Sequence, residues 1–264
     1  MQILGPLSVT TGTIEVAPTA PKQRQTLALL LVNANHVVTM SQVLHELWAY
    51  DPPASAIEAV HIYVMQLRRS LGVLDAPRLV TRQHGYQLFV QSGELDLDVF
   101  TARVASARLA LTRDELTFAA GQFHSALDLW HADALVDIEP GPILASAVAG
   151  IERRRLDVVS QRIRVELRLG LHHELLSELS GLVHRHPSDE DLLSHLMLAL
   201  YRSGRQVDAL TAFHALRTTL AREHGVSPSD PLRRLYNSIL SGDRHLEIAP
   251  VRGARLSLDL GTPA

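Results

Sequence analysis

The residues best suited to chemistry in this sequence lie on one predicted helix between Ala54 and Gly72. Two prolines precede Ala54, and neither proline nor glycine interrupts the chain again before Gly72. The two faces of this helix differ in composition. One face carries charged and polar side chains together with Ile62 and Met65. Arginine, glutamine and histidine beside outward apolar side chains are suited to contact the phosphates and base edges of a duplex. The other face predicts a buried apolar stripe formed by Ile57, Val60, Val64, Leu67 and Leu71.

An amphipathic surface helix with solvated arginines would show the same pattern, so this alternative stays open for the helix taken alone. The following segment favours contact with a duplex. Residues 78–81, 82–86 and 87–90 read as a strand, a glycine-containing turn and a second strand. The sequence therefore predicts a β-hairpin directly after the helix, with Arg82 close to its tip.

The preceding fifty or so residues supply the elements that would position this helix and hairpin. Short strands are expected in 1–9 and 13–16, a strongly apolar helix in 22–34 and an extended piece in 37–39. Ser41 is expected to cap a second helix. The buried face of that helix is predicted to comprise Val43, Leu44, Leu47 and Trp48. Strands, three helices and a hairpin in this order predict an α+β winged helix-turn-helix.

An ordered series of short stretches in this region resembles the OmpR-type DNA-binding domain of the Streptomyces antibiotic regulatory proteins. The resemblance covers roughly the first ninety residues. The stretches are Gly5-Pro6-Leu7, Pro21-Lys22-Gln23-Arg24, Leu29-Leu30-Leu31, Asn33-Ala34-Asn35, Leu47-Trp48, Pro52-Pro53-Ala54-Ser55-Ala56, Leu67-Arg68-Arg69 with Leu71-Gly72, and Thr81-Arg82 with Gly85-Tyr86.

The resemblance implies that 54–71 is the recognition helix and that the hairpin is the wing. Arg82 would enter the minor groove, where a narrow A·T-rich stretch concentrates negative potential. The wing has Gln83-His84 where the family often has prolines, and Met65-Gln66 lie where relatives are often more polar or basic, so the target sequence is not transferred. The DNA-contacting residues implied by position are Glu58, His61, Ile62, Met65, Gln66, Arg68, Arg69, Arg82 and Tyr86.

Composition is consistent with a DNA-binding domain that has a small basic site. The chain has 264 residues, 46% of them apolar, which favours two domains with modest cores. Residues 1–90 carry 6 Lys/Arg and 5 Asp/Glu, whereas 91–264 carry 19 and 23. A small basic site on a nearly neutral domain suits weak binding to single sites that several protomers reinforce.

Catalytic, metal and cofactor functions are not expected. The chain has no cysteine, which excludes disulfides, thiolate catalysis and cysteine-bound zinc. Histidines cluster at His172-His173 and at His184 and His186, but no HExxH pattern or clear carboxylate partner accompanies them. No nucleophile elbow, glycine-rich turn or GxxxxGK[ST] stretch occurs, so neither an enzyme nor the ATPase module of larger relatives is expected.

Location follows from what the sequence lacks. No signal-peptide pattern and no run of about 20 apolar residues is present, so we expect a cytoplasmic protein, at the nucleoid when bound to DNA, with no membrane partner. The winged helix is expected to start at the first residue, which leaves no room for a receiver domain.

The rest of the chain has helical periodicity and an internal repeat. Gly170, Leu175, Leu179 and Leu182 recur 34 residues later as Gly204, Ala209, Phe213 and Leu216. This is the tetratricopeptide period, in which glycine closes the turn between paired helices. Pro187 lies where the second helix of such a repeat ends, and Gly121 is expected to mark an earlier, weaker copy. An all-α, tetratricopeptide-like domain of three helix pairs is predicted, which either binds a peptide or protein or serves only as a scaffold.

This half also resembles a known domain, the bacterial transcriptional activator domain. The resemblance rests on 94–100 (ELDLDVF), 126–135 (ALDLWHADAL), the helix around 152–156, His186-Pro187, 200–210 and 220–240. The expected organisation is a winged helix in 1–91, an activator domain in 94–240 and a disordered tail in 241–264.

The two resemblances imply a sequence-specific transcriptional activator of an antibiotic or other secondary-metabolite gene cluster. Its partners would be direct repeats in double-stranded DNA, bound as a homodimer, and RNA polymerase holoenzyme. Two alternatives stay open. The helical domain could make the chain a ligand-responsive one-component regulator, or the chain could be an interaction adaptor whose winged helix no longer binds DNA, an idea prompted by Met65-Gln66 and the net charge of −3.

Overall fold

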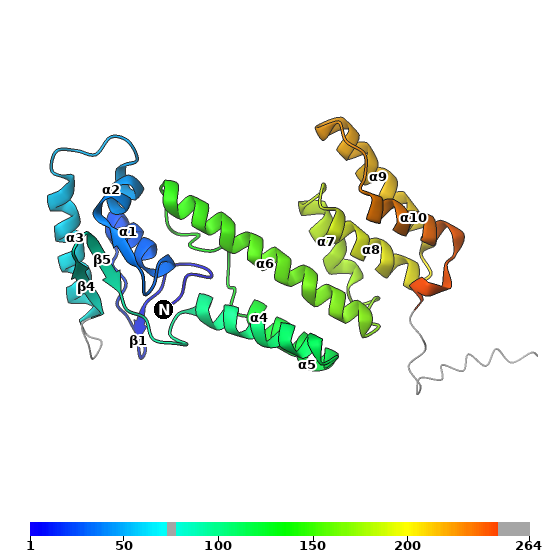
Figure 1. The fold of residues 1–264 in the computed structure, drawn as a ribbon, viewed down its shortest axis with the longest axis horizontal. Coiled ribbons are helices and arrows are strands. Elements are labelled where there is room, and N and C mark those ends of the chain that lie inside the picture. The colour runs from blue at the N-terminus through cyan, green and yellow to red at the C-terminus, as the bar shows by residue number, and fades with distance from the viewer. Residues whose placement is uncertain (73–77, 248–264) are drawn as a thin grey trace, which may run out of the picture. The chain divides into compact units, whose positions relative to one another are not determined.

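The computed structural model describes residues 1–72 and 78–247, and its contacts divide the chain into two compact units, Met1–Gln161 and Arg162–Ala264. Figure 1 shows the order of the elements along the chain. The first unit contains the winged helix together with the helices that follow it. The sequence domains predicted for 1–91 and 94–240 therefore divide the chain at a different place from its compact units.

The winged helix is built on a three-stranded antiparallel sheet with strand order β3-β5-β4. A separate two-stranded ribbon pairs β1 with β2, and Gln2 forms an isolated bridge with Ser8. The elements are β1 (Thr10–Thr11), β2 (Ile14–Glu15), α1 (Pro21–Val32), β3 (Val37–Thr39), α2 (Met40–Trp48), α3 (Ala56–Leu71), β4 (Leu79–Arg82) and β5 (Gly85–Leu88). This order confirms the predicted winged helix-turn-helix.

Helix α1 forms the centre of this core. Its residues from Gln25 to Leu31 are all buried, as expected for a helix that is apolar on every side. Helix α2 begins after Thr39, whose hydroxyl accepts the N–H of Gln42 at 3.2 Å while the Gln42 side chain accepts the N–H of Thr39 at 2.8 Å. This capping box makes Thr39 the N-cap, so the prediction of Ser41 in that role was wrong.

The apolar stripe of α3 is confirmed except at its first residue. Val60, Val64, Leu67 and Leu71 are buried, but Ile57 is 48% exposed and Ala56 takes the inward position instead. The buried face of α2 also differs from the prediction, because Glu46 is buried beside Val43 and Leu47.

Three further helices complete the first unit: α4 (Asp96–Thr112), α5 (Leu116–Leu127) and α6 (Pro142–Arg168), the last of which continues into the second unit. Helices α4 and α5 pack against each other, and Asp114 turns the chain between them at a φ of 58°. Aspartate tolerates this left-handed conformation through local hydrogen bonds. Gly121 lies inside α5, so its predicted role as a repeat turn was wrong.

The second unit contains the end of α6 followed by α7 (Leu176–Arg185), α8 (Glu190–Arg202), α9 (Gln206–His224), α10 (Asp230–Ser241) and the 3₁₀ turn η1 (Arg244–Leu246). Gly170 and Gly204 close the α6–α7 and α8–α9 turns at φ values of 88° and 75°. Pro187 follows the end of α7, as predicted. The leucines, alanine and phenylalanine of the repeat are buried, which confirms the tetratricopeptide-like helix pairs in this part of the chain.

Most of the tail predicted to be disordered, 248–264, lies outside the described residues. The described part, up to 247, includes η1, and the Nε of Arg202 donates to the carbonyl of Leu246 at 2.7 Å. Within residues 1–72 and 78–247, no helix is long and apolar enough to cross a membrane.

Gly85→Ala should destabilise the winged helix by about 1–3 kcal/mol, the usual cost of overpacking a core. A Cβ at Gly85 would lie 2.0 Å from the carbonyl oxygen of Val38 and 2.7 Å from the Cα of Thr39, so β3 and β5 would have to separate. Urea unfolding followed by circular dichroism measures the change. Gly121→Ala is the matched control, because its Cβ meets nothing within 4 Å and alanine favours helix. Equal stability of the two variants would contradict the close strand approach.

Candidate nucleic-acid interface

The outward face of α3 brings together five of the residues predicted to contact DNA. They share one helical stripe, spaced three or four residues apart, and all are exposed: Glu58, His61, Ile62, Met65 and Arg69. Ile62 is 49% exposed and Met65 is 52% exposed, although α3 has an apolar core face of its own. The stripe therefore offers two apolar contacts between a histidine and an arginine, which is the chemistry needed to meet thymine methyls and phosphates or guanine edges.

Gln66 has a different environment from its neighbours on α3. It is half-buried, and its side-chain oxygen accepts a hydrogen bond from the amide of Gln23 on α1. This bond fixes the orientation of the Gln66 amide and leaves its own NH₂ group as the available donor. Sequence reasoning missed Gln23, because no local pattern links two glutamines 43 positions apart.

Arg68 ties α3 to the wing. Its Nε donates to the carbonyl of Leu79 at 2.9 Å and its Nη2 donates to the hydroxyl of Thr81 at 2.7 Å, both on β4. Two N–H donors of the Arg68 guanidinium are therefore already hydrogen-bonded within the protein. The neighbouring Arg69 makes no hydrogen bond or ion pair within the described residues. Of this pair, Arg69 is the arginine available to a ligand.

Arg82 lies at the end of β4, beside the turn of the wing. Its Nε donates to Oε1 of Gln87 on β5 at 2.7 Å, and its Cζ lies 5.6 Å from the centre of the Phe89 ring. The residue is exposed, so its charge faces solvent while its side chain is held in place. Gln87 and Phe89 were not predicted as part of this site. The register of the hairpin places them next to the Arg82 side chain.

Tyr86 lies in the core of the winged helix. It is on β5, the central strand of the sheet, opposite Val38 on one side and Thr81 on the other, and it is 5% exposed. Burial raises the pKa of its phenol, although the nearby charge of Arg68 acts in the opposite direction. Because its side chain packs inward, we leave Tyr86 out of the surface available to a duplex.

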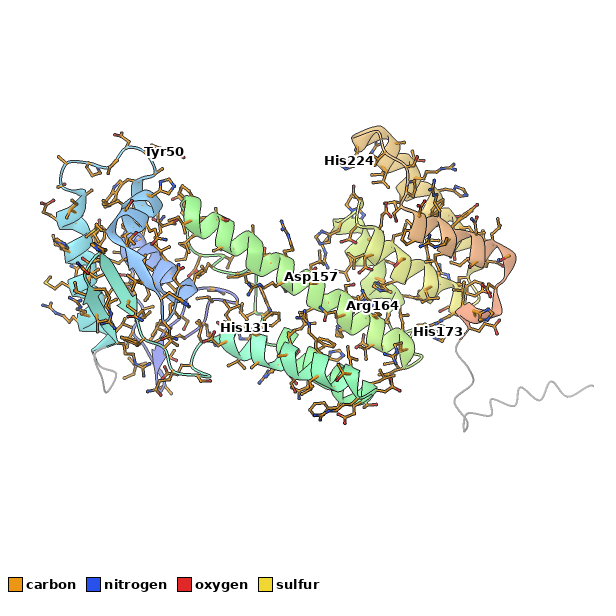
Figure 2. The ribbon with its side chains drawn as sticks, in the orientation of Figure 1. Tyr50, His131, Asp157, Arg164, His173 and His224 are labelled. Atoms are coloured by element: carbon orange, nitrogen blue, oxygen red, sulfur yellow. The ribbon has the colours of Figure 1, made fainter. Side chains whose placement is uncertain are left out.

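The loop between α2 and α3 is also exposed. Tyr50, labelled in Figure 2, is 91% exposed, and residues 51–55 that follow it are exposed as well. The ring of His45 on α2 meets the Tyr50 ring edge-on, with 5.3 Å between their centres. A large aromatic side chain on this loop is a second apolar feature of the first unit that its own core does not bury.

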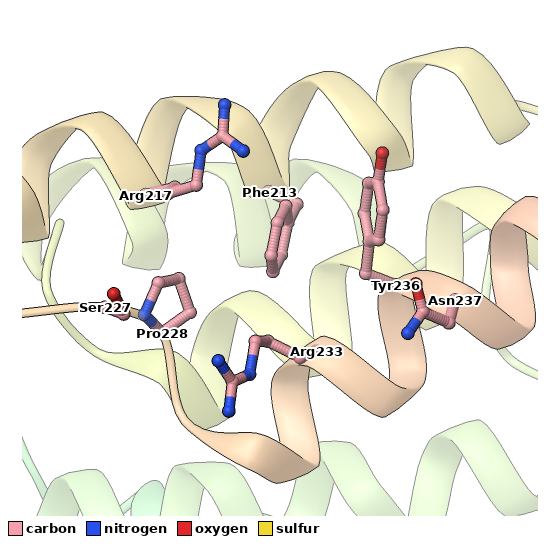
Figure 3. Close-up of a pocket in the computed structure, with 7 residues that line it drawn as sticks. All are labelled: Phe213, Arg217, Ser227, Pro228, Arg233, Tyr236 and Asn237. Atoms are coloured by element: carbon pink, nitrogen blue, oxygen red, sulfur yellow. The ribbon is translucent and has the colours of Figure 1, made fainter.

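The second unit contains an open pocket of about 290 Å³ between α9 and α10. Figure 3 shows Phe213 and Tyr236 as its aromatic wall, with the guanidinium groups of Arg217 and Arg233 beside it. The two aromatic rings stack with 4.3 Å between their centres. Arg233 pairs with Asp230, whereas Arg217 has no ion pair within the described residues. Aromatic and cationic groups in one pocket suit a flat ligand that carries a negative charge.

The histidine pairs do not form a metal site in the part of the chain that the structure describes, where no group of three potential ligands occurs. The rings of His172 and His173 lie 4.6 Å apart. Burial, followed by the charge of His173, lowers the pKa of His172. These histidines therefore offer no geometry for a cation.

Two family models match the chain. Residues 15–88 match the model described as transcriptional regulatory protein, C terminal, and residues 95–240 match the bacterial transcriptional activator domain. The second match covers more than half of the chain.

Similar proteins include the regulatory protein DnrI of Streptomyces peucetius, which is 41% identical over 92% of this chain and 92% of its own length. The regulatory protein AfsR of Streptomyces griseus is 33% identical over 92% of this chain, which spans only 25% of AfsR. Among solved structures, Mycobacterium tuberculosis EmbR in complex with a low affinity phosphopeptide superposes with a TM-score of 0.87 at 30% identity, over 91% of this chain and 64% of EmbR.

Arg68→Ala should lower the free energy of unfolding by about 1 kcal/mol, since it removes two hydrogen bonds that hold β4 on α3. Arg69→Ala, its neighbour and matched control, should change it by less than about 0.5 kcal/mol. Urea unfolding of both variants tests the difference, and faster amide exchange in β4 should accompany Arg68→Ala alone. Identical behaviour would mean that Arg68 does not anchor the wing.

Proposed function

Because this chain belongs to the Streptomyces antibiotic regulatory protein family, in which an OmpR-type domain precedes a bacterial transcriptional activator domain, we propose that it activates transcription from direct repeats at promoters. Its class is that of transcriptional regulators. The proposal adds the DNA sites, the side-by-side protomers and the recruitment of RNA polymerase holoenzyme. The regulated genes are those of an antibiotic or other secondary-metabolite cluster.

The observation that carries the proposal is the exposed stripe on α3 beside the wing. Ile62 and Met65 are half-exposed on a helix whose other face is fully used by the core. An α-helix of this width fits the major groove, where Ile62 and Met65 contact thymine methyls and Arg69 binds phosphate or guanine. Arg82 enters the adjacent minor groove, where its charge meets the strongest negative potential.

Charge explains why several protomers are needed. Only a few arginines face outward from the proposed surface, and Arg68 is already engaged by β4. Few phosphate contacts give weak binding to one site, because most of the non-specific affinity comes from released counterions. A second protomer on the adjacent repeat raises the effective concentration and supplies the missing affinity.

The helical part of the chain supplies the contacts with the second protomer and with polymerase. Its paired helices expose apolar side chains, among them Leu109, Phe118 and Val207, which the protein's own core does not use. In this function the chain needs no cofactor and performs no catalysis.

A second candidate function, ligand-responsive regulation, is favoured by the pocket between α9 and α10. Phe213 and Tyr236 provide an aromatic wall, and Arg217 provides at its edge a charge that has no ion pair among residues 1–72 and 78–247. An aromatic carboxylate would satisfy both features. The two candidate functions are compatible, since a regulator can bind DNA through one unit and a small molecule through the other.

Selection of bound sequences from random double-stranded DNA, with the full chain, tests the main proposal. We expect it to enrich a direct repeat. Titration of the selected duplex at two salt concentrations should then show steep loss of affinity with salt. Failure to enrich any sequence would overturn direct DNA recognition and favour the adaptor alternative.

Arg69→Ala and Arg82→Ala should each weaken binding to the selected duplex by about 1–3 kcal/mol and reduce the salt dependence by about one phosphate contact. Fluorescence anisotropy measures both quantities. Arg113→Ala, on the exposed turn after α4, changes the net charge equally and should leave affinity within about twofold. A comparable loss with Arg113→Ala would mean that net charge, and not this surface, determines binding.

An aromatic carboxylate such as salicylate should stabilise the folded chain by about 2.7 kcal/mol when present at 100 times its Kd. Thermal unfolding over a ligand titration measures the shift. Arg217→Gln should abolish it, whereas Arg222→Gln, whose native arginine pairs with Glu223 and does not line the pocket, should retain it. No shift with any member of a panel of aromatic acids would count against ligand sensing at this pocket.

A further inference from the structure

The first turn of α6 is capped by a carboxylate that belongs to the winged helix. Glu46 lies on α2 and is 1% exposed. Its carboxylate accepts the backbone N–H of Gly141 at 2.6 Å and those of Ile143 and Leu144 at 2.9 Å. The side-chain amide of Gln25 on α1 donates a fourth hydrogen bond at 2.9 Å. Free N–H groups and the helix dipole both favour a negative charge at this end of a helix.

The fit between α2 and the start of α6 is close. A Cβ at Gly141 would lie 1.9 Å from the carbonyl oxygen of Glu46 and 2.8 Å from its Cδ. Leu144 is completely buried within the first turn of α6, and this turn has no acidic residue of its own. The cap of α6 therefore comes from a residue 95 positions earlier than Gly141.

Other carboxylates also join the same parts of the chain, but Asp96 and Asp137 both lie outside α2 and α3. Asp96 accepts the N–H groups of Ile3 and Leu4 at 2.9 to 3.0 Å, and Asp137 accepts the N–H of Leu7 at 2.8 Å. These bonds hold the N-terminal segment, and Asp137 also pairs with Arg24 on α1. Glu46 is the member of this set that connects a helix of the helix-turn-helix to α6.

This connection gives the proposed DNA surface a mechanical link to the activator domain. Helix α2 packs against α3, whose outward face would lie in the major groove. The part of α6 in the first unit, 142–161, extends about 30 Å at the usual rise per residue. An angular change at its capped first turn displaces the far end of this segment most, so the cap sets where the end of the segment at Gln161 lies relative to α3.

We propose that Glu46 is a positioning residue that couples DNA recognition to activation by holding residues 142–161 of α6 at a fixed angle to the recognition helix. The inference rests on the proposed function and adds a division of roles to it. Recognition of one half-site needs α3 and the wing. Side-by-side binding and contact with polymerase need α6 in the position that Glu46 imposes.

Glu46→Gln in the full chain tests the inference, since glutamine keeps the size but removes the charge and one acceptor oxygen. Three quantities are compared: affinity for a single half-site, cooperativity on the direct repeat, and transcription with purified polymerase. We expect half-site affinity to change less than about twofold, while cooperativity and transcription each fall about tenfold, within the usual range of coupling between sites. Amides of 143 and 144 should exchange faster.

Glu139→Gln is the matched control, because it makes the same charge change at an exposed residue just before α6. It should behave as the unchanged protein in every assay. Gly141→Ala is the second variant and disturbs the same contact from the α6 side, so it should reproduce the loss of cooperativity with half-site binding intact. The double variant should be no worse than the more severe single variant.

Full cooperativity and transcription in a folded Glu46→Gln protein would overturn the inference. So would an equal loss of half-site binding and transcription, since that is the signature of a residue that only stabilises the fold. Absence of binding by the unchanged protein, with faster exchange at the start of α6 in the variant, would overturn the proposed function instead and leave Glu46 as a structural cap.

Discussion

The negative charge of Glu46 can stay buried only because donors from α1 and from the start of α6 surround it. A carboxylate without such partners would carry a desolvation penalty of several kcal/mol. The donors come from two segments that are far apart in sequence, so the winged helix does not complete its own core. It shares its polar interior with the domain that follows, and both lie in the first compact unit, Met1–Gln161.

Local pattern predicted much of this fold. The spacing of Val60, Val64 and Leu67 identified the buried face of α3, and the glycines at 170 and 204 identified the turns between paired helices. These features follow from the helical period and from backbone geometry, both of which are determined by residues close together in the sequence. The same reasoning failed for Gly121, because spacing alone does not distinguish a turn glycine from one inside a helix.

Only part of the candidate site could be predicted from the sequence. Helical spacing predicted the outward stripe with Ile62 and Met65, but it gave no sign that Arg68 would bond to β4 or that Tyr86 would lie inside the sheet. Those outcomes depend on the register of the wing and on how the hairpin packs against α3. Glu46 was missed for the same reason, since a charged residue on an amphipathic helix is expected to face solvent unless its distant partners are known.

The proposed interface therefore combines fixed and free side chains. Arg68 and Gln66 are held by hydrogen bonds within the protein, and the outward residues beside them are free to meet a ligand. Much of the geometry is set before any ligand arrives. Fewer side chains then lose conformational freedom on binding, which favours affinity without added contact area.

The support of Arg82 by Gln87 and Phe89 has a consequence for how target sites would be distinguished. A guanidinium held by its own strands cannot follow a groove that widens, so the strength of its contact would vary with the width of the minor groove. Groove width depends on base composition over several neighbouring steps. Under the proposed function, promoters with identical bases under α3 would then be ranked by their flanking A·T content.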